Sequence, residues 1–116
     1  MEPGVDLDAA IVRKVFRRIV VVDSATGEMA LKDRATNKNL PIPKYSTEMS
    51  ATYVLVKYFQ SIGYHVEVGS EVLSDRLVWR AIYRNYNGGP SIGCEGTTLS
   101  HAVCLGAIQL MDELNS

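Results

Sequence analysis

Two short stretches of this 116-residue sequence carry side chains suited to holding a phosphate group. The first is Lys44-Tyr45-Ser46-Thr47, which directly precedes an expected helix. There, free backbone N–H groups, two hydroxyls, the helix dipole and the Lys44 ammonium group would face an anion together. The second is a strand on which Arg80, Arg84 and Tyr86 share one face. Guanidinium groups beside an aromatic ring suit a nucleotide, because they hydrogen-bond the phosphate while the ring stacks on the base.

Both stretches also have a purely structural interpretation. Ser46 or Thr47 would cap the following helix, with the ring of Tyr45 packed beneath it. On the strand, Trp79 and Tyr83 lie on the face opposite the arginines. That aromatic side would then be core, and the arginine side would be solvated or would meet the acidic residues of a helix.

A basic segment near the N-terminus offers a weaker site for a phosphate backbone. Four basic residues there form two i,i+4 pairs on an expected helix, namely Arg13, Lys14, Arg17 and Arg18. The whole chain has 12 Lys plus Arg against 13 Asp plus Glu, a formal net charge of -1. Since no global positive field draws such a chain onto nucleic acid or an anionic membrane, nucleic-acid binding is the less favoured interpretation.

No spacing in the chain predicts catalysis, a metal site or a bound cofactor. The two histidines, His65 and His101, lie in no acid/base or metal-ligand motif. Cys94 with His101 would make a nucleophile pair only if the fold joined them and a third group oriented the imidazole. Cys94 and Cys104 are expected to be buried, reduced thiols. We therefore expect a protein that is not an enzyme.

Three amphipathic helices and four to five strands are expected to position these residues. The helices are expected at 6–18, 46–62 and 99–114, and the strands at 19–22, 29–31, 64–68, 77–86 and 91–96. Residues 33–44, rich in Asn and Pro, are expected to be irregular. The element order α-β-β-α-β-β-β-α predicts one α+β domain over 1–116, a layered α/β/α sandwich around a mostly antiparallel sheet.

Four stretches, in this order and spacing, resemble the phage ABA-sandwich domain family, small proteins of bacteriophages and prophages. They are the opening helix of residues 6–12, P-x-Y-S-T-[DE] at 43–48, G-[YF]-x-V-x-[VIL] at 63–68 and T-L-x-x-A-[IV] at 98–103. Together they span nearly the whole chain, but residues 23–42 are longer and more polar than the usual connection. The resemblance implies a layered α/β sandwich and a phage origin, and it implies no activity.

We therefore expect a phage or prophage accessory protein that acts by binding. The N-terminus lacks the basic start and apolar stretch of a signal peptide, and the apolar run Ile19–Val22 is too short to span a membrane, so the host cytoplasm is the expected location. The favoured version is a homodimer or larger homo-oligomer that sequesters a small anionic, nucleotide-like immune signal of the host between subunits, as an anti-defence protein. The alternative is a module that binds and modulates a host or phage protein.

Overall fold

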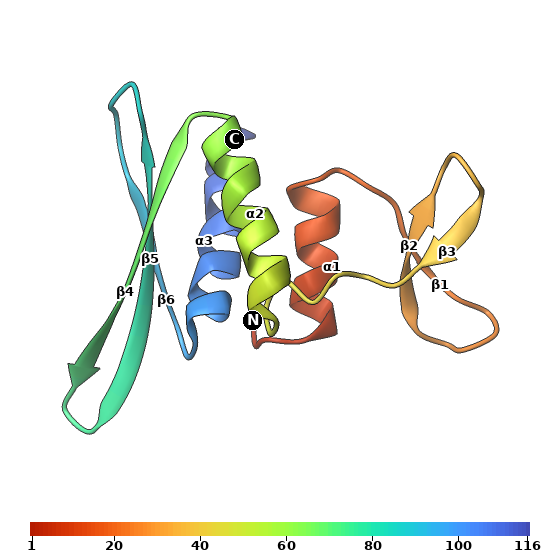
Figure 1. Ribbon diagram of the computed structural model, residues 1–116, viewed down its shortest axis with the longest axis horizontal. Coiled ribbons are helices and arrows are strands. Elements are labelled where there is room, and N and C mark those ends of the chain that lie inside the picture. Colours follow the sequence, from red (N-terminus) through yellow and green to blue (C-terminus); the bar gives the residue numbers. More distant parts are fainter.

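The computed structural model describes all 116 residues and has a mixed α+β fold (Figure 1). In chain order the elements are α1 (Val5–Lys14), β1 (Val20–Val22), β2 (Met29–Asp33), β3 (Lys38–Leu40), α2 (Met49–Ser61), β4 (Tyr64–Leu73), β5 (Arg76–Asn85), β6 (Ile92–Gly96) and α3 (Leu99–Leu114). The strands form two separate antiparallel sheets, β1-β2-β3 and β4-β5-β6. We call the first the small sheet and the second the large sheet.

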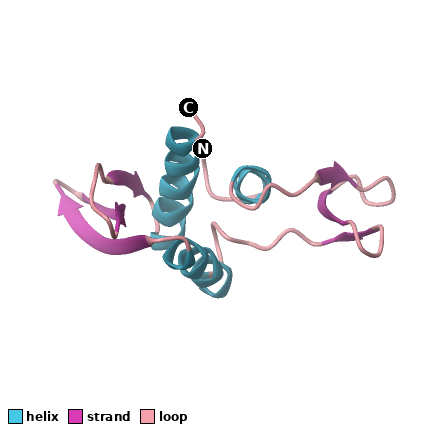
Figure 2. Ribbon diagram, turned by 90° about the horizontal axis from the view of Figure 1, so that it is seen from above, coloured by secondary structure: helices cyan, strands magenta, loops and turns pink.

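The helices lie between the two sheets, so the layering differs from the expected sandwich around a single sheet. In Figure 1 the large sheet stands on the left, the small sheet on the right and the helices in the middle. The view from above shows α1 on the side of the small sheet and the other two helices beside the large sheet (Figure 2). The sequence pattern of a hairpin involves only neighbouring residues. It does not predict whether two hairpins pair with each other in one sheet.

The large sheet is built on a long hairpin. β4 and β5 pair over ten residues, from Tyr64↔Asn85 to Leu73↔Arg76, so the strand continues through residues expected to form a turn. Tyr83 of β5 is fully buried, and its hydroxyl donates a hydrogen bond to the Val103 carbonyl of α3 at 2.6 Å. Gly106 allows this approach, because a Cβ there would lie 2.5 Å from the Tyr83 ring.

The small sheet contains a strand that was not predicted. β3 pairs with β2 from Leu31↔Leu40 to Asp33↔Lys38, within residues expected to be irregular. Its three residues are all exposed, so no alternation of apolar and polar side chains marks it as a strand. These residues form a strand only because they pair with β2, and that pairing depends on the turn between the two strands.

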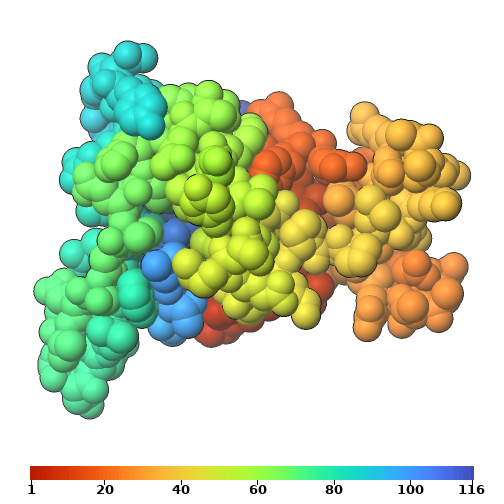
Figure 3. All heavy atoms as spheres, in the orientation of Figure 1, coloured from red at the N-terminus to blue at the C-terminus, as the bar shows by residue number.

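The small sheet projects from the rest of the molecule. The space-filling view shows the orange and yellow spheres of residues 20–40 standing out beside the helical body (Figure 3). Its contribution to the main core is Leu31, with Val20 packed at the margin. The radius of gyration is 15.0 Å, whereas a compact chain of this length has about 13 Å. No helix has the length and apolar character needed to cross a membrane.

Two helix boundaries differ from the prediction and one agrees. α1 ends at Lys14, and Arg17 has a φ of 53°, so the chain leaves the helix before the predicted end. α2 begins at Met49 with Glu48 as its N-cap and no side-chain cap, so the predicted capping by Ser46 or Thr47 is wrong. The predicted Thr98 cap of α3 is confirmed, since its side chain accepts a hydrogen bond from the His101 N–H at 3.1 Å.

Candidate anion-binding site

The turn at Tyr45-Ser46-Thr47, which precedes α2, already binds a carboxylate of the protein itself. The Ser46 N–H and hydroxyl both donate to Oδ1 of Asp8, at 2.8 and 2.7 Å, and Gly4 N–H donates to the Ser46 hydroxyl at 2.9 Å. Ser46 is 1% exposed and Asp8 4%. Tyr45 is buried and stacks on Phe16 with ring centroids 5.6 Å apart, and burial raises the pKa of Tyr45. These groups join α1 to the segment before α2 and are not free for a ligand.

Sequence reasoning missed the role of Asp8, although a signal was present. Asp8 precedes Val12 by four residues and Val15 by seven, and both valines are buried. That spacing places a carboxylate on the apolar stripe of the helix, where it needs hydrogen-bond donors. The donors come from a segment some forty residues away in the chain, at Ser46.

The two exposed residues of the same stretch line the largest hollow of the surface. Lys44 and Thr47 border a cavity of about 650 Å³ that lies between the start of α1, the 41–47 segment and the turn before β2. Asp8 and Glu28 also line it. The Lys44 ammonium lies 3.8 Å from the Glu48 carboxylate, so this cleft holds more negative than positive charge and does not favour an anion.

The arginines of β5 are paired with carboxylates on the face of the large sheet that points away from the helices. Arg80 lies 2.8 Å from Glu95 and 3.6 Å from Glu71, and Arg84 lies 3.2 Å from Glu67. The hydrogen bond to Glu95 raises the pKa of Arg80. These acidic partners lie on the neighbouring strands β4 and β6. The sequence had suggested acidic residues of a helix instead. The hollow around Arg80, of about 240 Å³, is lined by two carboxylates and one guanidinium.

The two predicted ligand-binding stretches do not converge within one protomer. Lys44 to Thr47 lie at the junction of α1 and α2, whereas Arg80 and Arg84 lie on the outer face of the large sheet, beyond the helix layer (Figure 1). Tyr86 is 61% exposed just beyond the end of β5, and its N–H donates to the Gly63 carbonyl at 2.9 Å.

Positive charge is concentrated in the half of the molecule that carries the small sheet. Residues 13–44 contain eight Lys and Arg against three Asp and Glu, a net charge of +5. The remaining residues contain four Lys and Arg against ten Asp and Glu, a net charge of -6. The overall net charge of -1 therefore conceals a strong separation of charge along the long axis.

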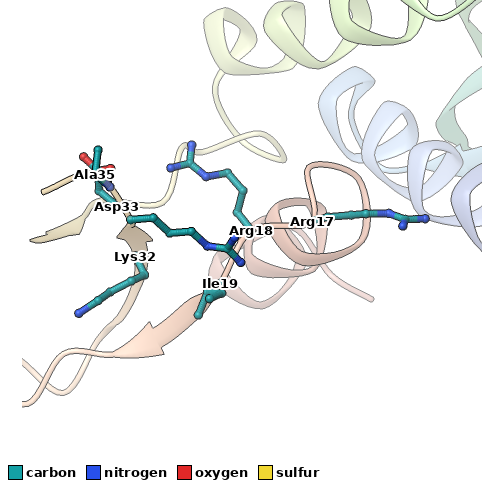
Figure 4. A pocket seen from close by; sticks show the side chains of 7 residues that line it. Arg17, Arg18, Ile19, Lys32, Asp33 and Ala35 are labelled. Atoms are coloured by element: carbon teal, nitrogen blue, oxygen red, sulfur yellow. Dashed lines mark hydrogen bonds between the residues drawn. The ribbon is translucent and has the colours of Figure 1, made fainter. Parts of the chain in front are cut away.

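Four basic residues of this half line a hollow of about 200 Å³, which we call the basic hollow (Figure 4). It is lined by Arg17, Arg18 and Ile19, which follow α1, and by Lys32, Asp33, Arg34 and Ala35 at the end of β2. Arg17 points toward α3 in Figure 4, where its guanidinium donates to the Asn115 side chain at 2.8 Å. Arg18, Lys32 and Arg34 form no ion pair.

The one carboxylate in the basic hollow is held by its own turn. Asp33 accepts hydrogen bonds from the Ala35 N–H and the Thr36 hydroxyl, both at 3.0 Å. These bonds, with Thr36 contributing most, and the nearby Arg18 charge lower the pKa of Asp33. The carboxylate stays ionised and directed into the turn, so it neutralises only part of the charge around it.

The four basic residues predicted to share a helix face do not lie together. Because α1 ends at Lys14, the predicted i,i+4 spacing does not exist beyond that residue. Lys14 forms an ion pair with Asp112 of α3 at 3.1 Å, and Arg17 also turns toward α3. Arg13 is exposed, and Arg18 belongs to the basic hollow.

Cys94 and His101 do not form a catalytic pair. His101 is buried, its Nδ1 accepts the Thr97 N–H at 3.0 Å, and its Nε2 donates to the Met1 carbonyl at 2.7 Å. The Cys94 thiol lies 2.7 Å from the Gln109 side-chain oxygen. No group of three His, Cys, Asp or Glu side chains is arranged to hold a metal ion.

No family model, no curated protein and no solved structure matches this chain. The similarity to the phage ABA-sandwich family thus rests on its four motifs alone, and it stays a prediction.

Proposed function

We propose that this protein is a non-enzymatic binding protein that recognises a phosphate-bearing anion at the basic hollow. The observation that carries the proposal is that Arg18, Lys32 and Arg34 lie around one hollow without carboxylate partners. An exposed guanidinium gains bidentate, charge-assisted hydrogen bonds when it meets a phosphate. A guanidinium that already holds a carboxylate must give up that partner first.

The proposed site differs from the two stretches that the sequence favoured. Arg80 and Arg84 would have to break their bonds to Glu95 and Glu67 to bind a ligand. Ser46 would have to release Asp8. The basic hollow requires neither change, and it includes two of the residues that the sequence marked for a phosphate backbone, Arg17 and Arg18.

The biological part of the proposal follows from the four motifs. We keep the accessory role in a phage or prophage, in the host cytoplasm, with a phosphate-bearing host molecule as the ligand.

The test is an NMR titration of the ¹⁵N-labelled protein with inorganic pyrophosphate. We expect amide shift changes concentrated at residues 17–19 and 32–35, and a loss of these changes in the double variant Arg18→Gln/Arg34→Gln. The matched control is Arg80→Gln/Arg84→Gln, which removes the same charge from the other sheet and should bind like the wild type. Shift changes centred on β5, or no shift changes at all, would contradict the proposal.

Self-association is a second candidate, which a separate observation favours. β4 is ten residues long and forms an edge of the large sheet, so one side of its backbone is unpaired. The β4–β5 hairpin extends beyond the helices in Figure 1, and there Val68, Val72 and Leu77 share an exposed apolar face. A second copy that pairs along β4 would satisfy the edge and cover these side chains.

Light scattering on a sizing column measures this directly. We expect about twice the monomer mass at micromolar concentration if β4 edges pair, and dissociation when Val72→Lys places a charge on the apolar face. A monomer mass at every concentration would exclude the paired form.

A further inference from the structure

We infer that the anion recognised at the basic hollow is the phosphodiester backbone of a nucleic acid, laid across the small sheet without reading the bases. This inference rests on the proposed function, since it names the class of ligand for the same site.

The unpaired cations extend well beyond the hollow. Of the 12 Lys and Arg, four form ion pairs, namely Lys14, Lys44, Arg80 and Arg84. Six of the other eight lie within residues 13–38, namely Arg13, Arg17, Arg18, Lys32, Arg34 and Lys38. Lys38 opens β3 directly opposite Asp33 in the strand register, next to the hollow. A single phosphate group would use only some of these charges.

The hollow is too small to enclose a mononucleotide. Its volume is about 200 Å³, whereas pockets that bury small ligands measure about 300–1,000 Å³. A phosphate group fits a shallow hollow of this kind while the remainder of the ligand lies outside. A nucleic-acid strand presents one charge per about 3.4 Å of helix axis, so it can occupy the hollow and meet the cations around it together.

The surroundings of the hollow offer no platform for the bases. The one aromatic residue within 13–44 is Phe16, and its ring stacks on the buried ring of Tyr45, which directly follows this segment. The exposed aromatic residues are Tyr53, in α2, and Tyr86, just beyond the end of β5. Binding through phosphates alone fixes position without base sequence, so we expect little sequence preference.

The opposite charge of the two halves orients the protein on a polyanion. The part outside residues 13–44 has a net charge of -6 and is repelled by phosphates, so only the small sheet can approach. The near-zero net charge of the chain does not argue against nucleic-acid binding, because the two charges are separated along a molecule 45 Å long.

Fluorescence anisotropy with end-labelled DNA of about 20 nucleotides, single-stranded and duplex, tests the inference at about 50 and 200 mM salt. If about four phosphates are neutralised, the affinity for the single strand should fall about 50-fold across this range, and scrambling the base sequence should change it less than about threefold. Arg18→Gln/Arg34→Gln should reduce the slope of log affinity against log salt by about 1 to 2. Arg80→Gln/Arg84→Gln should bind within about twofold of the wild type.

Other outcomes would contradict the location of the site, the nucleic-acid ligand or the proposed function itself. Equal losses in the two double variants would show that the basic hollow is not the site. Pyrophosphate binding without DNA binding would overturn the inference and leave the proposed function standing, and binding of neither would overturn both. Poly-glutamate that binds as tightly as DNA would identify an acidic protein surface as the partner instead. Circular dichroism and thermal melts of all variants check that these exposed substitutions leave the fold intact.

Discussion

The two sheets of this protein have the same number of strands and the same antiparallel order, yet they relate to the core in opposite ways. The large sheet places Ala81 and Tyr83 among the fully buried residues and packs one face on α3. The small sheet is built on strands of three to five residues, and all of β3 is exposed. The large sheet therefore stabilises the fold, whereas the small sheet is held out from it.

The two sheets also differ in whether their cationic side chains are paired with carboxylates. On the large sheet, Arg80 and Arg84 face carboxylates on the adjacent strands. On the small sheet, the carboxylate of Asp33 is bonded within its own turn and that of Asp23 to its turn and to Asn39 of β3, and the cations nearby are left unpaired. Cross-strand pairing neutralises one surface and turn formation leaves the other charged, and only the second surface is suited to bind an anion from solution.

The largest expected effect concerns the core contact of the large sheet. Tyr83→Ala should destabilise the protein by about 4 kcal/mol, because it empties a fully buried site and removes the hydrogen bond from the Tyr83 hydroxyl to the Val103 carbonyl. Leu31→Ala in the small sheet should cost less, about 2 kcal/mol, because Leu31 has a smaller side chain than Tyr83 and is the one residue of the small sheet within the main core. Urea unfolding of both variants measures the difference.

The exposed Tyr86→Ala is the control for the loss of a tyrosine, and it should change the free energy of unfolding by less than about 0.5 kcal/mol. If Leu31→Ala costs as much as Tyr83→Ala, the small sheet is part of the cooperative core and the contrast between the two sheets is wrong.

The next effect is the loss of the carboxylate that joins α1 to the segment before α2. Asp8→Ala should cost about 2 to 3 kcal/mol, because the buried Ser46 N–H and hydroxyl lose their acceptor. Asp8→Asn keeps one acceptor oxygen and should cost less. Thermal denaturation measures both, and an equal melting temperature for the two variants would show that the hydrogen bonds are not what the carboxylate contributes.

The secondary structure that depends on near neighbours could be predicted from the sequence, and the rest could not. The alternation along β5 and the cap at Thr98 are local signals, and both elements form as expected. The early end of α1 depends on a positive φ at Arg17, a residue that ordinarily favours helix. β3 exists only because Lys38 to Leu40 fold back on β2, which is a pairing and not a property of those residues.

The candidate site shows the same division. The spacing of Arg17 and Arg18 identified them as candidates for phosphate contact, but Lys32 and Arg34 join them only through the way the chain turns from α1 into β1 and pairs with β2. The Lys32 N–H that donates to the Ile19 carbonyl at 2.9 Å marks this pairing. Likewise, the arginine charges on β5 are balanced by carboxylates only because the strand register places Glu95 opposite Arg80.

A smaller effect concerns the turns of the small sheet at acid pH. Hydrogen bonds, above all those from Asn39 to Asp23 and from Thr36 to Asp33, lower the pKa of both carboxyls below their ordinary value of 3.8. Because the folded-state pKa is the lower one, their stabilisation is complete above 3.8 and is lost as the pH falls through the folded-state value. The small sheet should therefore open before the large sheet during acid titration.

Hydrogen exchange measured segment by segment distinguishes the two sheets. Amides of β1 to β3 should lose protection at a higher pH than those of β4 and β5, and Asp33→Asn should move this loss toward neutral pH. Simultaneous loss of protection in both sheets would mean that the turns are not the first interactions to fail.

The smallest effect is on the reactivity of the two thiols, which reports on the large-sheet side of the molecule alone. Cys94 on β6 is half-buried and Cys104 on α3 is fully buried. Burial raises the pKa of both thiols, that of Cys104 to about 12, so few thiolates exist at neutral pH. Cys94 should react slowly with a disulfide reagent at about pH 8, and Cys104 should react only when the protein unfolds. In a Cys94→Ser background, only the reaction of Cys104 is observed. Its rate should rise in Tyr83→Ala and stay unchanged in Asp33→Asn, because only the first substitution loosens the layer that covers Cys104.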